Sequence, residues 1–177
     1  KEDAIDVDFL SVDILIIAVP SKNIIGFQRL ISQVEKSSIK RVIFISSTSV
    51  YANSKQSITE IDKTLDTPLA KIESLFFANA GFKTGVLRFG GLFGEGRNPG
   101  SFFKNGRVIK NPDGVVNMVH QEDCIAIIHK VIESEVGNEV FNACADTHPT
   151  RRDFYTKAIY KQRKEMPVFE ENKQVSI

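Results

Sequence analysis

The sequence has little of what marks several large classes of protein. Its 177 residues include two cysteines, Cys124 and Cys144, which are too few for a disulfide scaffold in a chain of this length. We therefore expect a reducing compartment, the cytoplasm. The longest apolar run, residues 14–20, is far shorter than the roughly 20 residues that a membrane span needs, so no membrane partner is expected.

An excess of charge of either sign is also lacking. Lys and Arg total 23 against 22 Asp and Glu, which gives a formal net charge of +1. Proteins that bind nucleic acid neutralise phosphates with a concentrated excess of basic residues. The charge balance therefore predicts that nucleic acid is not a partner.

Clusters of metal ligands are missing as well. The three histidines, His120, His129 and His148, have no short paired spacing, and neither cysteine belongs to a C-x-x-C pair. We predict no metal site. A Ser-His-Asp triad has no support either, because such a triad is recognised by geometry rather than by position in the chain.

What the sequence does contain is an alternation of strand and helix patterns. Runs of β-branched and aliphatic residues predict strands, and the first two are expected to be buried on both faces. Apolar residues at helical spacing predict helices, with Ser21 capping the first and Gly81 just past the end of the second. The expected strands cover residues 12–18, 42–45, 86–89, 115–119 and 140–143. The expected helices cover residues 24–34, 66–80, 121–132 and 150–159. This order predicts an α/β fold with a mostly parallel sheet and flanking helices.

Ligands of open α/β sheets bind outside the carboxyl ends of the strands, and three such ends can be read here. The first, residues 18–20, is by itself an ordinary strand terminator. Four consecutive hydroxyl residues, 46–49, follow the second strand and favour a polar site, and the long loop to residue 66 is expected to be functional or mobile. A glycine-rich stretch, residues 90–96, follows the third strand. No clear helix comes after it, so we expect a flexible loop over a site rather than a phosphate-binding loop.

Two Tyr-x-x-x-Lys patterns are present, at Tyr51 and Lys55 and at Tyr160 and Lys164. A lysine near a phenol can lower the pKa of that phenol enough for proton exchange near neutral pH. The second pattern lies on an expected helix far from the hydroxyl run, where a solvated helix face is the simpler interpretation. The first directly follows the hydroxyl run.

Four segments, in this order along the chain, resemble the extended short-chain dehydrogenase/reductase superfamily, in its NAD-dependent epimerase/dehydratase group. They are residues 41–51 (RVIFISSTSVY), 87–97 (LRFGGLFGEGR), 117–123 (NMVHQED) and 137–142 (GNEVFN). Residues 146–155 and 167–169 are similar to one atypical branch of that group, whose members are described as nucleoside-diphosphate-sugar epimerase-like.

The resemblance implies a Rossmann-like domain that binds NAD or NADP. Ser47 matches the catalytic Ser or Thr, which bonds to the reacting oxygen of the substrate. The family's Tyr-x-x-x-Lys helix corresponds to Thr67 and Lys71, so the lysine matches as a catalytic residue while the tyrosine does not. Tyr51 matches the tyrosine that closes the serine motif, which is not the proton donor. The residues expected to border the cofactor follow three strands; they are Ala18, Val19, Pro20, Ser46, Phe89 and Gly90.

The glycine-rich first βα turn of the family, which holds the pyrophosphate of the cofactor, is absent from these 177 residues. The resemblance therefore predicts one incomplete NAD(P)-binding Rossmann-like domain over residues 1–177, without its N-terminal βαβ part. A small substrate-side portion is expected from about residue 91. Exposed strand edges invite association, and a homodimer is one way to cover them.

The resemblance leaves the function open between two main alternatives. One is an NAD(P)-dependent oxidoreductase or epimerase that acts on a sugar-like substrate, with Ser47 polarising the reacting oxygen. The other is a catalytically silent NAD(P)-binding module, or a redox or nucleotide sensor. The second arises because the aliphatic hydroxyl of Thr67 is a poor proton carrier near neutral pH. A scaffold that uses the fold only for packing is a third reading.

Overall fold

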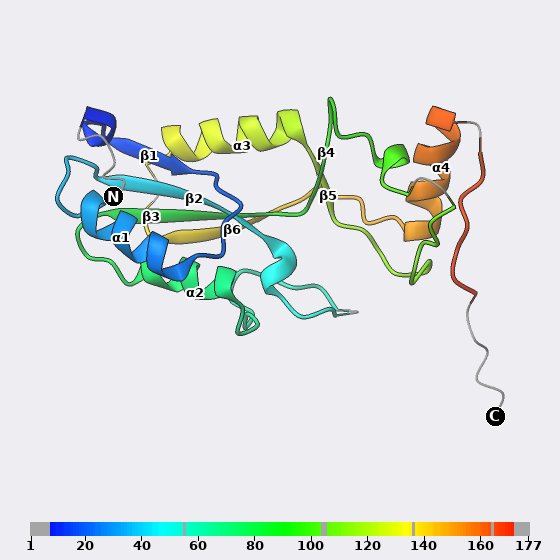
Figure 1. Ribbon diagram of the computed structural model, residues 1–177, viewed down its shortest axis with the longest axis horizontal. Helices are drawn as coiled ribbons and strands as arrows, with labels where there is room; N and C mark the ends of the chain where they lie inside the picture. The colour runs from blue at the N-terminus through cyan, green and yellow to red at the C-terminus, as the bar shows by residue number, and fades with distance from the viewer. Residues whose placement is uncertain (1–7, 55, 104–105, 136, 164, 172–177) are drawn as a thin grey trace. The chain divides into compact units, whose positions relative to one another are not determined.

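The chain divides into two compact units, residues 1–90 with 126–143 and residues 91–125 with 144–177. The computed structural model describes residues 8–54, 56–103, 106–135, 137–163 and 165–171. Lys55 and Lys164, the lysines of the two Tyr-x-x-x-Lys patterns, lie outside the described residues. Figure 1 labels the helices and strands of both units.

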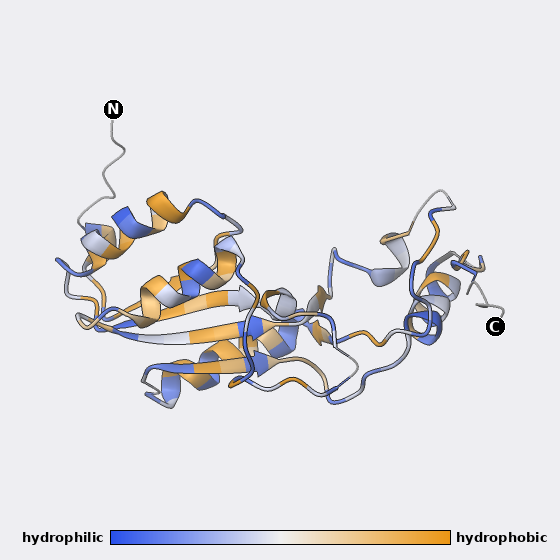
Figure 2. Ribbon diagram, turned by 90° about the horizontal axis from the view of Figure 1, so that it is seen from below, coloured by the Kyte–Doolittle hydropathy of each residue, from blue (hydrophilic) through white to orange (hydrophobic). Residues whose placement is uncertain are grey.

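The first unit is built on a four-stranded sheet in which every neighbouring pair is parallel. Its strands, in spatial order, are β1 (Ile14–Ile17), β2 (Arg41–Ser47), β3 (Lys83–Phe89) and β6 (Glu139–Ala143). The sheet carries mostly hydrophobic residues along its strands (Figure 2). Because the strands are parallel, their carboxyl ends all lie at one edge of the sheet. The structure confirms the predicted α/β fold with a parallel sheet.

Helices cover both faces of this sheet (Figure 1). They are α1 (Ile24–Val34), α2 (Pro68–Phe77) and the later part of α3 (Gln121–Glu133). Side chains of a strand alternate between its two faces. In β3, Thr84 bonds to Phe76 of α2, while a Cβ on the next residue, Gly85, would lie 3.7 Å from Val131 of α3. The two helices α2 and α3 therefore lie on opposite faces.

The core under α1 and α2 is aromatic. Phe44 of β2 stacks on Phe76 of α2 with ring centroids 5.1 Å apart, and Phe27 of α1 meets Phe44 edge-on at 5.8 Å. Phe76 is fully buried. Such pairs prefer these offset and edge-to-face geometries, and they add to the free energy gained by burying the rings.

Burial of the first two strands follows the prediction only in part. In β2, Val42, Ile43 and Phe44 are all at most 2% exposed, as predicted for a strand covered on both faces. In β1 the prediction was wrong, because Ile16 is 44% exposed. This strand lies at the end of the strand order. Its buried residues pack in the cluster that includes α1, and the opposite face, which carries Ile16, is left open to solvent.

Local capping differs from the prediction at two helix ends. Helix α1 has the predicted bounds, but its cap is Asn23, whose side chain accepts from the Gly26 amide at 3.0 Å, rather than Ser21. Helix α2 is shorter than residues 66–80 and ends at Phe77, before Gly81, with its C-cap in the right-handed region.

The second unit holds two short parallel strands, β4 (Gly91–Phe93) and β5 (Met118–His120), and helix α4 (Arg151–Arg163). The expected strand over residues 115–119 is thus shorter and shifted toward the C-terminus. One half of the predicted capping box is confirmed, because the Thr150 hydroxyl accepts from the Asp153 amide at 3.1 Å. The Asp153 carboxylate accepts from the Thr150 hydroxyl at 2.8 Å, not from the Thr150 amide as in a complete box. Tyr155 and Ile159 of α4 form a buried cluster with Ile109, Val116 and Met118.

Three short 3-10 turns complete the described elements, at Asp8–Leu10, Thr48–Val50 and Pro99–Ser101. Only the last follows the glycine-rich stretch, and it spans three residues. Among the described residues between β4 and β5 there is thus no α-helix, in agreement with the prediction that no clear helix directly follows those glycines. No helix in the described part of the chain is long and apolar enough to cross a membrane.

The aromatic cluster predicts a strong dependence of stability on Phe76. Replacing Phe76 by Ala should lower the free energy of unfolding by about 3–5 kcal/mol, because it removes a buried ring and leaves a cavity. Phe9, which is 60% exposed, supplies the control: its replacement by Ala should cost less than about 1 kcal/mol. Urea unfolding followed by circular dichroism measures both. Equal losses for the two variants would contradict this account of the core.

Candidate functional site

The carboxyl edge of the sheet brings together the residues that the sequence placed at strand ends. In the parallel register Ser46 lies opposite Arg88, and Ser47 lies opposite Phe89, which in turn lies opposite Ala143 of β6. Gly90 follows directly, and its amide donates to the Ala143 carbonyl at 2.9 Å. Ser46, Ser47, Phe89 and Gly90 therefore share one edge.

The residues after β1 belong to the same edge of the sheet. This strand ends at Ile17, opposite Phe44 of β2. Ala18, Val19 and Pro20 follow and are all exposed. They present small apolar side chains beyond the end of the strand.

Neighbouring residues in these strands face opposite sides of the sheet. Ser46 and Arg88 both bond to Glu73 of α2, so they face that helix. By alternation, Ser47 and Phe89 face the other side. The edge is thus divided into a buried face toward α2 and a second face that carries Ser47.

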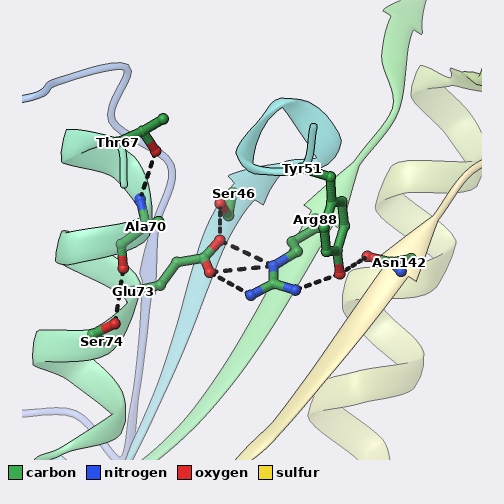
Figure 3. Close-up of polar contacts among 8 residues, drawn as sticks. All are labelled: Ser46, Tyr51, Thr67, Ala70, Glu73, Ser74, Arg88 and Asn142. Carbon is green, nitrogen blue, oxygen red and sulfur yellow. Dashed lines mark hydrogen bonds and ion pairs between the residues drawn. The ribbon is translucent and has the colours of Figure 1, made fainter. Parts of the chain in front are cut away.

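On the α2 face, a buried ion pair lies just inside the edge (Figure 3). Arg88 and Glu73 are 6% and 4% exposed. Arg88 Nη2 lies 2.6 Å from Glu73 Oε2, and Arg88 Nε lies 3.2 Å from each carboxylate oxygen. The Ser46 hydroxyl donates to Glu73 Oε1. Burial lowers the pKa of Arg88, but the hydrogen bonds and charge of Glu73, together with Tyr51, outweigh it and raise that pKa, so Arg88 stays charged.

Tyr51 extends this network to the last strand of the sheet. Arg88 Nη1 donates to the Tyr51 hydroxyl, which donates to Asn142 Oδ1 at 3.0 Å. The guanidinium carbon also lies 4.9 Å from the centroid of the Tyr51 ring. This phenol is buried and has a partner on each side, which suits a structural role rather than proton transfer to a ligand.

Ser47 has a different environment. It is half-buried, and its Oγ accepts from the Ser49 amide at 3.1 Å, which caps the turn Thr48–Val50. No described residue accepts the proton of this hydroxyl. Ser47 can therefore donate a hydrogen bond to a ligand at the edge.

Thr67 and Lys71 are engaged locally at the start of α2. The Thr67 hydroxyl accepts from the Ala70 amide at 3.2 Å as the N-cap of the helix. Lys71 Nζ lies 3.1 Å from Asp66 Oδ1, and the Lys71 side chain is 53% exposed. Among the described residues, no hydrogen bond or ion pair joins either side chain to Ser47.

The loop between β2 and α2 is tied to the sheet by a carboxylate. Glu60 Oε1 accepts from the Asn142 amide of β6 at 2.7 Å. Within the loop, Asp62 accepts from the Thr59 amide at 2.6 Å, and this bond is the main cause that lowers the pKa of Asp62. The polar residues of this loop are therefore used, in part, to hold it against the carboxyl edge.

Sequence reasoning missed Glu73 and Asn142 and gave Arg88 no role of its own. A signal for two of them was available, because Glu73 follows Ile72 on the apolar stripe of α2 and Arg88 interrupts an apolar strand. Charged residues in such positions are rarely buried unless they are paired. In the described part of the chain, no group of three or more His, Cys, Asp or Glu side chains is placed to hold a metal ion.

Comparison with known proteins gives one family and several similar structures. The family model described as "NAD dependent epimerase/dehydratase family" matches residues 17–144. Protein YeeZ of Escherichia coli K12 is 32% identical over 167 residues, a match that covers 86% of this chain and 61% of YeeZ. The chain thus spans less than two thirds of the length of that relative.

The similar structures share the fold at low sequence identity. A functionally unknown conserved protein from Silicibacter pomeroyi DSS has a TM-score of 0.79 and 20% identity, covering 99% of this chain and 66% of that one. The UDP-N-acetylglucosamine 4-epimerase from Methanobrevibacter ruminantium M1 has a TM-score of 0.75 and 19% identity, covering 99% and 69%. MoeE5, in complex with UDP-glucose and NAD, has a TM-score of 0.71 and 18% identity, covering 93% and 68%. These likenesses show a Rossmann-like fold.

The buried pair predicts a non-additive double-mutant cycle. Glu73→Leu and Arg88→Met should each lower the free energy of unfolding by about 3–5 kcal/mol, because each leaves an uncompensated buried charge. The double variant should lose clearly less than the sum, with a coupling of about 1–3 kcal/mol in urea unfolding. The exposed pair of Lys71 and Asp66, changed to Ala, is the control and should couple by less than about 1 kcal/mol. Additive losses at Glu73 and Arg88 would refute the pairing.

Proposed function

This chain belongs to the NAD-dependent epimerase/dehydratase family of the extended short-chain dehydrogenase/reductase superfamily, and on that premise we propose that it is an NAD(P)-dependent oxidoreductase or epimerase for a sugar-like substrate. The observation that carries the proposal is the carboxyl edge, where parallel strands end together and Ser47 retains a proton to donate. Ligands of open α/β sheets bind at such an edge.

The residues at the edge suit a dinucleotide. Ala18, Val19 and Pro20 are exposed and apolar, so they can pack against the flat faces of a nucleotide. Phe89 and Gly90, at the end of β3, would border the nicotinamide end. Ser46 turns its hydroxyl toward Glu73, so its contribution to the cofactor would come from its main chain. A bound nicotinamide cofactor supplies hydride transfer.

Ser47 would then orient and polarise the substrate. Its Oγ already accepts from Ser49, which fixes the position of the oxygen and leaves the hydroxyl proton to donate. A hydroxyl or carbonyl oxygen of the substrate is a suitable acceptor. The sugar-like class is supported by MoeE5 and the Methanobrevibacter epimerase, whose structures hold UDP-glucose and UDP-N-acetylmuramic acid.

A catalytically silent NAD(P)-binding module is the second candidate, and the start of α2 favours it. The Thr67 hydroxyl is used as a helix cap, and Lys71 pairs with Asp66 in solvent. An aliphatic hydroxyl has no pKa near neutrality, so Thr67 cannot replace a phenol as proton carrier. If Lys71 is catalytic, as proposed from the resemblance, its ion pair with Asp66 must open first.

If the cofactor binds at the carboxyl edge, its Kd should respond to a substitution beyond the carboxyl end of β1 but not to one before the amino end. Val19 lies beyond the carboxyl end and is 56% exposed, while Val12 lies before the amino end and is 41% exposed. In the full-length protein, calorimetry should detect NAD or NADP binding. Val19→Asp should raise the Kd about tenfold or more, because packing the nucleotide against residue 19 would then desolvate an unpaired carboxylate.

The matched variant Val12→Asp should leave the Kd unchanged. Equal weakening by both variants would place the cofactor elsewhere. If a folded full-length protein bound neither NAD nor NADP, both the enzyme and the silent binder would be excluded, and the scaffold would remain.

The enzyme and the silent binder differ in their response to a change at Ser47. If the protein is an enzyme, UDP-sugars added with cofactor should be converted, and Ser47→Ala should lower the rate about 100-fold or more while the cofactor Kd changes less than about twofold. Product analysis by chromatography measures conversion. A protein that binds cofactor but converts no UDP-sugar, even as Thr67→Tyr, would support the silent module instead.

A further inference from the structure

We infer that Glu73 is a positioning residue that holds the carboxyl edge of the sheet in the shape required for the dinucleotide. The inference rests on the proposed NAD(P) site and deepens it. Glu73 is 4% exposed and extends from α2 toward the sheet, where it is covered by strand residues, so it acts through other residues rather than on a ligand. It bonds directly to Ser46 and Arg88, which are opposite each other in the register.

Both oxygens of this carboxylate are occupied. Oε1 accepts from Ser46 and from Arg88 Nε, and Oε2 accepts from Arg88 Nε and Nη2. Taking two charges out of water is expensive, and a well-packed apolar pair can stabilise a core equally well. What the polar pair adds is direction, because charge-assisted and bidentate bonds fix the orientation of the groups they join.

The Glu73 network reaches the carboxyl ends of β2, β3 and β6, but not that of β1. Glu73 bonds to Ser46, which precedes Ser47, and to Arg88, which precedes Phe89. Through Tyr51, Arg88 reaches Asn142, which precedes Ala143. Each contact fixes the second-to-last residue of its strand. Because side chains alternate along a strand, the last residue then faces the opposite side of the sheet.

The position of Ser47 depends most directly on this arrangement. Ser46 is held toward α2, so Ser47 faces away, and its oxygen caps the turn Thr48–Val50 through the Ser49 amide. Tyr51 ends that turn, with its amide bonded to the Thr48 carbonyl, and its hydroxyl is held by Arg88. The serine turn, defined here as residues 47–51, therefore follows directly on Ser46, which bonds to Glu73, and ends at Tyr51, which bonds to Arg88.

The other end of α2 provides a contrast within the same helix and strand. There Thr84 of β3 is fully buried, and its hydroxyl donates to the Phe76 carbonyl at 3.1 Å. This bond also joins α2 to β3, but it lies near the amino end of the strand. Losing it should weaken the packing of α2 without altering the serine turn.

The test measures two properties of the full-length protein carrying Glu73→Gln. Glutamine keeps the size and one acceptor oxygen but loses the charge and the second acceptor. We expect the Kd for NAD or NADP to rise about tenfold or more, because the edge loses its preorganisation. We also expect the Ser49 amide to exchange its hydrogen about tenfold faster by NMR, because Ser47 no longer holds its position.

Two further variants separate positioning from general loss of stability. Thr84→Val should lower the urea midpoint but leave the cofactor Kd and the Ser49 exchange rate as in wild type. Ser46→Ala removes only the bond from the Ser46 hydroxyl to Glu73, and should speed Ser49 exchange as Glu73→Gln does. If Glu73→Gln does not fold, Ser46→Ala decides the question.

The outcomes are distinguishable. Unchanged Kd and unchanged Ser49 exchange in Glu73→Gln and Ser46→Ala would overturn the inference, and so would equal effects in Thr84→Val. If the wild type binds neither cofactor, the proposed function fails. The exchange of Ser49 then still decides whether Glu73 orders the serine turn.

Discussion

The parallel register of β2 and β3 is the constraint on which the rest of the structure depends. These two strands run side by side over seven residues each, from Arg41 opposite Lys83 to Ser47 opposite Phe89. Burial holds them there, because β2 is covered on both faces and a slip by one residue would exchange those faces. The same register places Ser46 beside Arg88 within reach of Glu73, and it places Ser47 and Phe89 together at the edge. Fold, buried ion pair and candidate site are consequences of one alignment.

Much of the fold could be predicted because its signals are local. Apolar runs predicted the strands, and helical spacing predicted α1 with its correct bounds. The errors occurred where tertiary structure decides. The amide oxygen of Asn23 caps α1 in place of the predicted Ser21 hydroxyl, and α2 ends before Gly81. The exposure of Ile16 depends on which neighbours cover β1, and periodicity within a strand carries no information about them.

The candidate site was predictable as a location but less so as an arrangement. The hydroxyl run after β2 indicated a polar edge, but not that Ser46 and Ser47 face opposite sides of the sheet. Glu73 and Arg88 are 15 residues apart, so their pairing depends on the packing of α2 against β3. Thr67 was considered as a possible proton carrier, but its hydroxyl caps α2 by accepting from the Ala70 amide. The proposed cofactor binding does not need the Thr67 hydroxyl, whereas turnover would need a proton carrier at that place.

The central claim is that a nicotinamide cofactor occupies the carboxyl edge of the sheet. Backbone amide shifts of the full-length protein, recorded by NMR during addition of NAD and of NADP, test it most directly. The account predicts the largest shifts at Val19, Ser47, Phe89 and Gly90, and no shift at Val12 or at the amino ends of the strands. Shifts confined to the second unit, or spread evenly over the chain, would contradict it.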